Sequence, residues 1–295
     1  MNTSMDSPPL SDWLALREAA DFASRSQRLT RLAAAALAGV APARVLDLGT
    51  GTGSNLRYLV EKLPPHQQWV VVDRDPTLLE HLQARTRTWA AARGYTVAAE
   101  PGGFVITGNA LECHVETRQR DLGSVDDAGL FAGRHLVTAS ALLDLVSPGW
   151  LQTLAAHCRS AGATALFTIT YDGRSPCAPA DADDDLVREL FNRHQRTNKG
   201  LGGIAAGPDG AAAAVAAFEA AGFRVEHEPS DWVIEPDAQE LQRQLIDGWA
   251  GAATETAPEI ATQIANWRRR RLQHVADGGS LIVVGHEDMF AVGHS

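Results

Sequence analysis

The 295-residue sequence has few cysteines and no long apolar run. Its three cysteines, Cys113, Cys158 and Cys177, lie far apart and form no CxxC pair, which argues against a disulfide framework and against a cysteine zinc site. The longest apolar run covers residues 32–41, well short of the ~20 residues that a transmembrane helix needs. The first ten residues contain no basic segment followed by an apolar one, so we expect no signal peptide. These absences predict a soluble cytoplasmic protein without a membrane partner.

Basic residues are also in short supply. The chain has 26 Lys plus Arg against 36 Asp plus Glu, a formal net charge of −10. Nucleic-acid binding depends mostly on Lys and Arg that neutralise phosphates, so this balance argues against a nucleic-acid partner while leaving room for a local basic patch. The composition, 45% hydrophobic and 21% charged, is typical of a globular chain. A chain of this length can bury a large core without disulfides or metals, and we expect no metal site.

Strands and helices are expected to alternate through the first part of the chain. Helical periodicity covers residues 13–37, as one helix or two. Short apolar strands are expected at 44–49, 69–73, 135–140 and 164–171, and helices between them at 54–63, 76–93 and 149–159. A hairpin with its turn at Gly108 and Asn109 is expected to lead into a third strand at 113–122. This βαβ series predicts an α/β fold with a parallel sheet and helices on both faces.

The remaining elements complete one expected domain over residues 1–295. Residues 1–41 are expected to form an N-terminal helical cap, and residues 173–210 an insert or lid between strands five and six. The acidic run 181–185 is typical of a helix start, and the four arginines at 268–271 are expected to be solvated or ion-paired. The further elements are helices ending near 196 and at 211–221, 239–249 and 259–275, and strands at 223–233 and 280–286. The expected total is seven strands, of which the last two are antiparallel candidates.

The most informative segment is the loop between the first strand and the helix that follows it. Glycines at positions 49, 51 and 53 give a GxGxG spacing, whereas a dinucleotide fingerprint, GxGxxG, would place glycine at Ser54. Asp47 precedes the first glycine by two residues, and its charge would repel a pyrophosphate and attract an ammonium or a sulfonium. The loop thus favours a cationic ligand over a dinucleotide.

Two more acids follow later strands. Asp73 ends the second strand about 20 residues beyond the glycine loop, where a carboxylate can accept both hydroxyls of an adenosine ribose. Asp121 ends the third strand, where it can accept from an adenine amine. Together with Asp47, these acids outline a nucleoside joined to a cationic amino-acid tail, which is S-adenosylmethionine.

Residues 44–171, roughly, resemble the class I S-adenosylmethionine-dependent methyltransferases. The motifs that carry the resemblance are VLDLGTGTG at 45–53, VVVD at 70–73, RDL at 120–122 and VTASALLDLV at 137–146. The resemblance implies a Rossmann-like, seven-stranded, mostly parallel sheet whose last strands are antiparallel. It also implies cofactor contacts from Asp47, Gly49, Thr50, Gly51, Gly53, Asn55, Asp73, Arg74, Asp121, Leu122 and Ser140.

The resemblance distributes these residues along the cofactor. Asp47 and the glycine loop would hold the methionine end, Asp73 the ribose, and Asp121 with Leu122 the adenine, while Ser140 would form the floor near the methyl group. One departure narrows the acceptor: nucleic-acid amino-methyltransferases carry (D/N)PP(Y/F) after strand four, and this chain has SALL at 140–143. Base methylation by that chemistry is therefore not expected.

Methyl transfer requires the acceptor atom to be held ~3 to 3.5 Å from the methyl carbon. A hydroxyl acceptor also needs a base, for which the candidates are Asp144, Tyr171 and His194, whereas an amine or thiol can do without one. Each candidate has a simpler alternative role: Asp144 as a cap, Tyr171 as part of a turn, and His194 as a surface residue.

The leading hypothesis is a methyltransferase that acts on a small-molecule acceptor by in-line O- or N-methylation. Three alternatives stay open: a non-catalytic S-adenosylmethionine-binding module, an RNA methyltransferase that uses the arginines at 268–271, and an NAD(P)-dependent oxidoreductase. A homodimer is compatible with the sequence.

Overall fold

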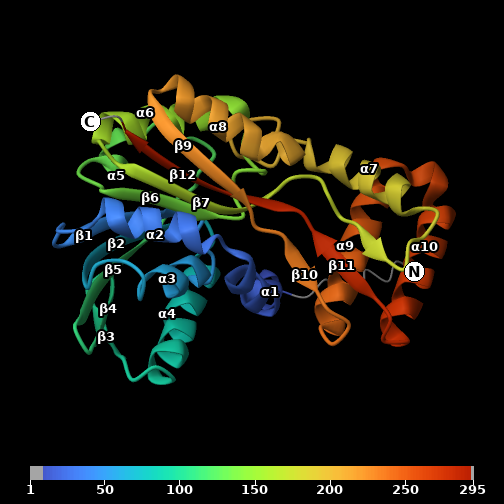
Figure 1. Cartoon of the computed structure of the whole chain (residues 1–295), viewed down its shortest axis with the longest axis horizontal. Helices are drawn as coiled ribbons and strands as arrows, with labels where there is room; N and C mark the ends of the chain where they lie inside the picture. Colours follow the sequence, from blue (N-terminus) through green and yellow to red (C-terminus); the bar gives the residue numbers. More distant parts are fainter. Residues whose placement is uncertain (1–8, 294–295) are drawn as a thin grey trace.

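A central sheet organises the chain in the computed structural model, which describes residues 9–293 (Figure 1). Nine strands follow the order β3-β4-β5-β2-β1-β6-β7-β12-β9. Five adjacent strands are parallel, so their carboxyl ends meet at one edge. These five are β1 (Ala43–Leu48), β2 (His66–Asp73), β5 (Leu111–Gln119), β6 (Leu136–Ser140) and β7 (Thr164–Tyr171).

The antiparallel strands lie at the two sides of this parallel centre. β12 (His286–Gly293) pairs antiparallel with β7 on one side and with β9 (Phe223–Pro229) on the other. At the opposite edge, the hairpin of β3 (Thr96–Glu100) and β4 (Gly103–Gly108) extends β5. The expected α/β class, with a mostly parallel sheet and antiparallel last strands, is confirmed. The central sheet has nine strands, whereas seven were expected in all.

Helices cover both faces of the sheet, because successive apolar side chains of β1 point to opposite faces and both are buried. Val45 packs with α2 (Gln27–Ala36), α3 (Ser54–Leu59) and α4 (Pro76–Ala91). Its neighbour Leu46 packs in the other layer, with α5 (Ala128–Phe131), α6 (Pro148–Ala161) and α8 (Gly210–Ala220). Successive side chains of a strand point to opposite faces, so a strand buried on both sides has an almost continuous apolar sequence.

A second, smaller sheet lies at the far end of the molecule from β3 and β4 (Figure 1). Its strands are β8 (Cys177–Ala178), β10 (Trp232–Ile234) and β11 (Leu281–Val284), in the order β10-β11-β8. They share a separate apolar core with α7 (Asp184–Gln195), α9 (Gln239–Thr256) and α10 (Ala261–Ala276), to which α1 (Leu10–Ser24) contributes partly buried side chains. Two short 3-10 turns, Gly207–Asp209 and Pro258–Ile260, precede α8 and α10.

The two strands expected near the C-terminus are each divided between the sheets. The expected strand at 280–286 is wrong as a single closing strand, because β11 joins the small sheet and β12, which continues to Gly293, enters the large one. Gly285 separates them at a close approach: a Cβ there would lie 2.1 Å from Asp172 Oδ1. The expected strand at 223–233 is likewise divided into β9 and β10.

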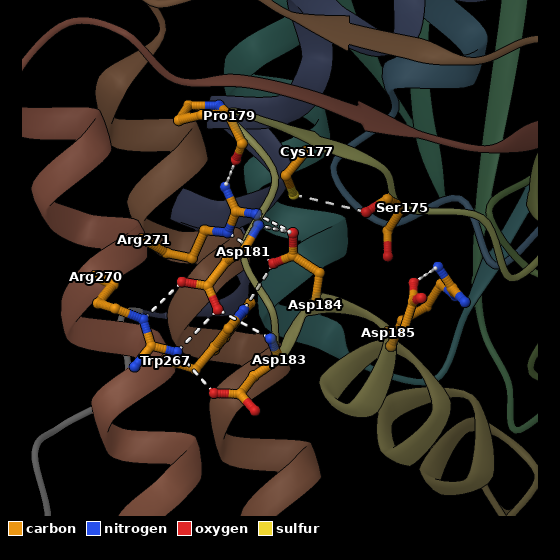
Figure 2. A network of polar contacts seen from close by, with 11 residues as sticks. Ser175, Cys177, Pro179, Asp181, Asp183, Asp184, Asp185, Trp267, Arg270 and Arg271 are labelled. Atoms are coloured by element: carbon orange, nitrogen blue, oxygen red, sulfur yellow. Dashed lines mark hydrogen bonds and ion pairs between the residues drawn. The ribbon is translucent and has the colours of Figure 1, made fainter.

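The acidic run and the arginines of α10 prove to be partners (Figure 2). Arg270 donates to both carboxylate oxygens of Asp181 at 2.6 and 2.8 Å and to Asp183 at 2.7 Å. The fully buried Arg271 donates to Asp184 and, at 2.7 Å, to the Pro179 carbonyl. The Arg270 guanidinium lowers the pKa of Asp181 to about 2. This network fixes the start of α7 against α10.

None of the helices between residues 9 and 293 is long and apolar enough to cross a lipid bilayer. Over the same residues, no three His, Cys, Asp or Glu side chains gather as the ligands of a metal ion would.

Candidate functional site

A cavity of about 520 Å³ opens at the carboxyl edge of the parallel strands and is covered by α1. Ligands of open α/β sheets bind at this edge, and the volume is in the usual range for a small-molecule site. Eight of the residues expected to bind a cofactor line it: Gly49, Thr50, Gly51, Asn55, Asp73, Arg74, Leu122 and Ser140.

The glycine loop passes between α1 and α4 with little space on either side. A Cβ at Gly51 would lie 3.0 Å from Leu14 Cδ1, and a Cβ at Gly53 would lie 2.7 Å from Leu82 Cγ. Gly53 also has φ +82°, a left-handed conformation that side chains disfavour. Gly53 itself caps the start of α3 and does not line the cavity. The spacing of the glycines is therefore set by the backbone path of the loop.

Asp73 lies in the cavity wall at the end of β2. Its Oδ2 accepts from the Gly51 N–H at 2.8 Å, and its Oδ1 accepts from the Asp75 N–H at 3.0 Å. A carboxylate oxygen can accept two hydrogen bonds, so each oxygen retains one acceptor position. The arrangement can therefore bind a pair of hydroxyl groups.

Asp47 lies beneath the loop and is fully buried, out of the cavity wall. It accepts from Thr50 Oγ1 at 2.6 Å and from Asn55 Nδ2 at 2.7 Å, and burial raises its pKa to about 6. The structure thus places Asp47 off the cavity wall, with its oxygens bonded to the loop and to the start of α3. Asp121 is also off the wall: its exposed carboxylate accepts from the Gly123 N–H at 2.8 Å, while its neighbour Leu122 lines the cavity.

One face of α1 supplies side chains that the sequence motifs do not reveal. Leu14, Arg17 and Asp21 recur at helical spacing and line the cavity. Arg17 Nη2 lies 3.0 Å from Asp21 Oδ1, and Asp21 is only 4% exposed. The available sequence signal was an Arg and an Asp four residues apart on a predicted helix, but the sequence does not show which face of that helix meets the cavity.

A buried arginine between α1 and α2 connects the loop to β6. Arg25 is 2% exposed and donates to Asn55 Oδ1 at 2.7 Å and to Ser140 Oγ at 3.0 Å. Ala141, the next residue along the floor, has φ +54°, and its N–H donates to the Thr168 carbonyl at 2.9 Å. A non-glycine residue held in this strained conformation is typical of binding sites.

None of the three candidate bases lines the cavity. Asp144 is buried, which raises its pKa to about 6. Tyr171 donates to Asn192 Oδ1 at 2.8 Å, and burial raises the pKa of its hydroxyl. His194 lies between a carboxylate and an ammonium: its Nε2 is 3.1 Å from Glu255 and its Nδ1 is 3.4 Å from Lys199. Of this group, Lys199 alone reaches the cavity wall.

The cavity wall combines hydroxyl-bearing and apolar residues. Thr52 Oγ1 and Ser54 Oγ are buried and have no hydrogen-bond partner among residues 9–293. The wall also offers apolar surface from Leu78, Leu122 and Leu142. This set fits a nucleoside that carries a charged tail.

No protein-family model and no curated protein sequence matches the chain. Solved structures match it over nearly its whole length. An S-adenosylmethionine-dependent methyltransferase from Geobacter sulfurreducens, in complex with S-adenosylhomocysteine, is 14% identical, with 98% of this chain and 100% of that chain covered and a TM-score of 0.46. The cyclopropane synthase MmaA2 from Mycobacterium tuberculosis is 12% identical, with 97% and 99% covered and a TM-score of 0.45. Because the sequence identities and TM-scores are this low, the function has to be inferred from the residues of the site.

Proposed function

We propose that the chain is an S-adenosylmethionine-dependent methyltransferase that acts on a small-molecule acceptor. The observation that carries this proposal is the meeting of Asp73 and the glycine loop in the wall of one covered cavity. The charged pair of Arg17 and Asp21 in the same wall supports it.

The residues of the wall suit each part of the cofactor. Asp73 would accept the ribose hydroxyls, and the apolar side chains of Leu78 and Leu122 would cover the adenine. On α1, Asp21 would bind the ammonium of the methionine end and Arg17 its carboxylate. Asp47 would act indirectly, by holding the loop that shapes the site.

S-Adenosylmethionine, when bound, supplies an electrophilic methyl group on a sulfonium. The chain's own contribution is to position the two reactants, and the side chains of α1 form part of the wall that would hold them. Tyr171 and His194 are engaged with other side chains, and Asp144 lies off the wall. These placements favour an acceptor that needs no base, such as an amine or a carboxylate.

The arginines of α10 do not favour the RNA alternative. Three of the four adjacent arginines are paired, Arg268 with Asp247 at 2.7 Å and Arg270 and Arg271 with the acidic run before α7, whereas Arg269 has no ion pair among residues 9–293. Cations that are already neutralised within the chain contribute little to phosphate binding.

Isothermal titration calorimetry with S-adenosylhomocysteine and with NADH tests the proposal. We expect binding of S-adenosylhomocysteine and none of NADH. The absence of S-adenosylhomocysteine binding up to about 1 mM would refute the proposal. Binding of NADH would favour the alternative function of an NAD(P)-dependent oxidoreductase.

A turnover assay then separates an enzyme from a binding module. The protein is incubated with S-adenosylmethionine and a small-molecule extract, and formation of S-adenosylhomocysteine is measured against a boiled control. We expect turnover. Binding without turnover on any extract would favour the non-catalytic module.

A further inference from the structure

Lysine is rare in this chain, and one of its lysines reaches the cavity. Of the 26 basic Lys and Arg residues only two are lysines, Lys62 and Lys199. Lys62 lies over the Tyr58 ring at 4.2 Å, away from the cavity wall. Lys199 follows α7 and lines the wall. The cavity wall therefore carries one compact, rotatable ammonium in addition to the guanidinium groups of Arg17 and Arg74.

Within the part of the chain that the structure describes, a histidine ring nitrogen, and no carboxylate oxygen, lies within hydrogen-bond distance of the Lys199 ammonium. Its Nζ lies 3.4 Å from His194 Nδ1, and the other ring nitrogen, Nε2, lies 3.1 Å from Glu255 Oε2. An imidazole that donates from Nε2 to a carboxylate has an acceptor at Nδ1, which suits an ammonium donor. Among residues 9–293 no carboxylate oxygen lies within 4.0 Å of Nζ. The positive charge of Lys199 is thus oriented without being neutralised.

The cavity that Lys199 lines also has an apolar part of its wall. Leu142, Leu145 and Leu201 line the same cavity, and Trp13 of α1 adds an aromatic side chain. Partial burial lowers the pKa of Lys199, which shows that the charge is partly desolvated. The Glu255 and Asp144 carboxylates partly offset this desolvation without pairing directly with Lys199, and a bound anion would add a direct, charge-assisted contact.

We propose that Lys199 binds the carboxylate of the methyl acceptor, so that the substrate class is small carboxylic acids with an apolar body. The inference rests on the proposed methyltransferase function, since the acceptor shares the cavity with the cofactor. Arg17 is not assigned to the acceptor because the proposed function places it at the carboxylate of the methionine end, beside Asp21. His194 becomes a positioning residue for the ammonium.

Matched acids and amides test this proposal on the full-length protein saturated with S-adenosylhomocysteine. The probes are benzoate, phenylacetate and octanoate, each compared with its neutral amide by calorimetry. We expect at least one acid to bind about tenfold or more tightly than its amide, as a charge-assisted contact predicts. Lys199→Met is expected to remove this preference and Lys199→Arg to retain part of it, whereas Lys62→Met is expected to leave it unchanged.

The outcomes separate this inference from the cofactor assignment. Equal binding of acids and amides, binding of no acid up to about 10 mM, or a preference that survives in Lys199→Met would overturn it. A loss of S-adenosylhomocysteine affinity in Lys199→Met as large as the loss of acid affinity would also overturn it, because Lys199 would then hold the cofactor. Failure of the wild-type protein to bind S-adenosylhomocysteine would instead refute the proposed function itself.

Discussion

Replacement of Asp73 should weaken S-adenosylhomocysteine binding in two graded steps. The Asp73 carboxylate already accepts from the Gly51 and Asp75 N–H groups, which leaves one acceptor position on each oxygen for the two ribose hydroxyls. A hydrogen bond to a charged group contributes about 1.5–3 kcal/mol, so loss of both in Asp73→Ala should cost at least about 3 kcal/mol, or roughly 150-fold in affinity. Asp73→Asn keeps one acceptor oxygen and should lose about 10- to 30-fold.

Calorimetry on the wild type and both variants measures this series, and thermal unfolding of the free proteins shows whether the fold survives. Asp121→Asn is the matched control, because the exposed Asp121 lies off the cavity wall and should bind within twofold of the wild type. Wild-type affinity in a folded Asp73→Ala variant would refute the ribose assignment. A loss in Asp121→Asn as large as that in Asp73→Asn would refute the placement of Asp121.

Three further predictions concern stability and the loop. Arg271→Ala should lower the free energy of unfolding by about 3–5 kcal/mol in urea titrations because it breaks a buried pair, while the exposed Arg268→Ala should cost less than about 1 kcal/mol; equal losses would contradict this. Gly53→Ala and Gly94→Ala should each lower the free energy of unfolding by about 1–2 kcal/mol through their positive φ. Only Gly53→Ala should also weaken cofactor binding, because its Cβ would displace the loop from Leu82, whereas a Cβ at Gly94 meets nothing within 4 Å. Burial raises the pKa of Asp144 from 3.8 to about 6, so its contribution to stability is fully present below pH 3.8 and is lost as the pH rises through 6. Relative to Asp144→Asn, the wild type should therefore lose up to about 3 kcal/mol between pH 4 and 7, and a constant difference across this range would exclude the shift.

The parts of the fold that follow from local signals could be predicted from the sequence. The β1 loop needs glycines where backbone and side chains approach closely, and Asp73 must follow a strand that ends at the same edge. Both requirements are visible in the sequence as patterns that span only a few residues. The alternation of strands and helices over residues 44–171 is visible for the same reason.

Features that depend on distant segments could not be predicted. β11 and β12 are both short apolar strands, and nothing local assigns one to the small sheet and the other to the position between β7 and β9. Arg25 reaches Ser140 across 115 residues of chain, and Lys199 reaches the cavity from beyond α7. A polar residue in a helix or loop carries no sequence signal for the partner it will meet.

A crystal structure of the protein with S-adenosylhomocysteine tests the central claim most directly. The account predicts electron density in the cavity beneath α1, with both ribose hydroxyls on the Asp73 carboxylate and the amino-acid end beside Arg17 and Asp21. A nucleoside bound elsewhere, or one in this cavity whose ribose does not contact Asp73, would contradict it.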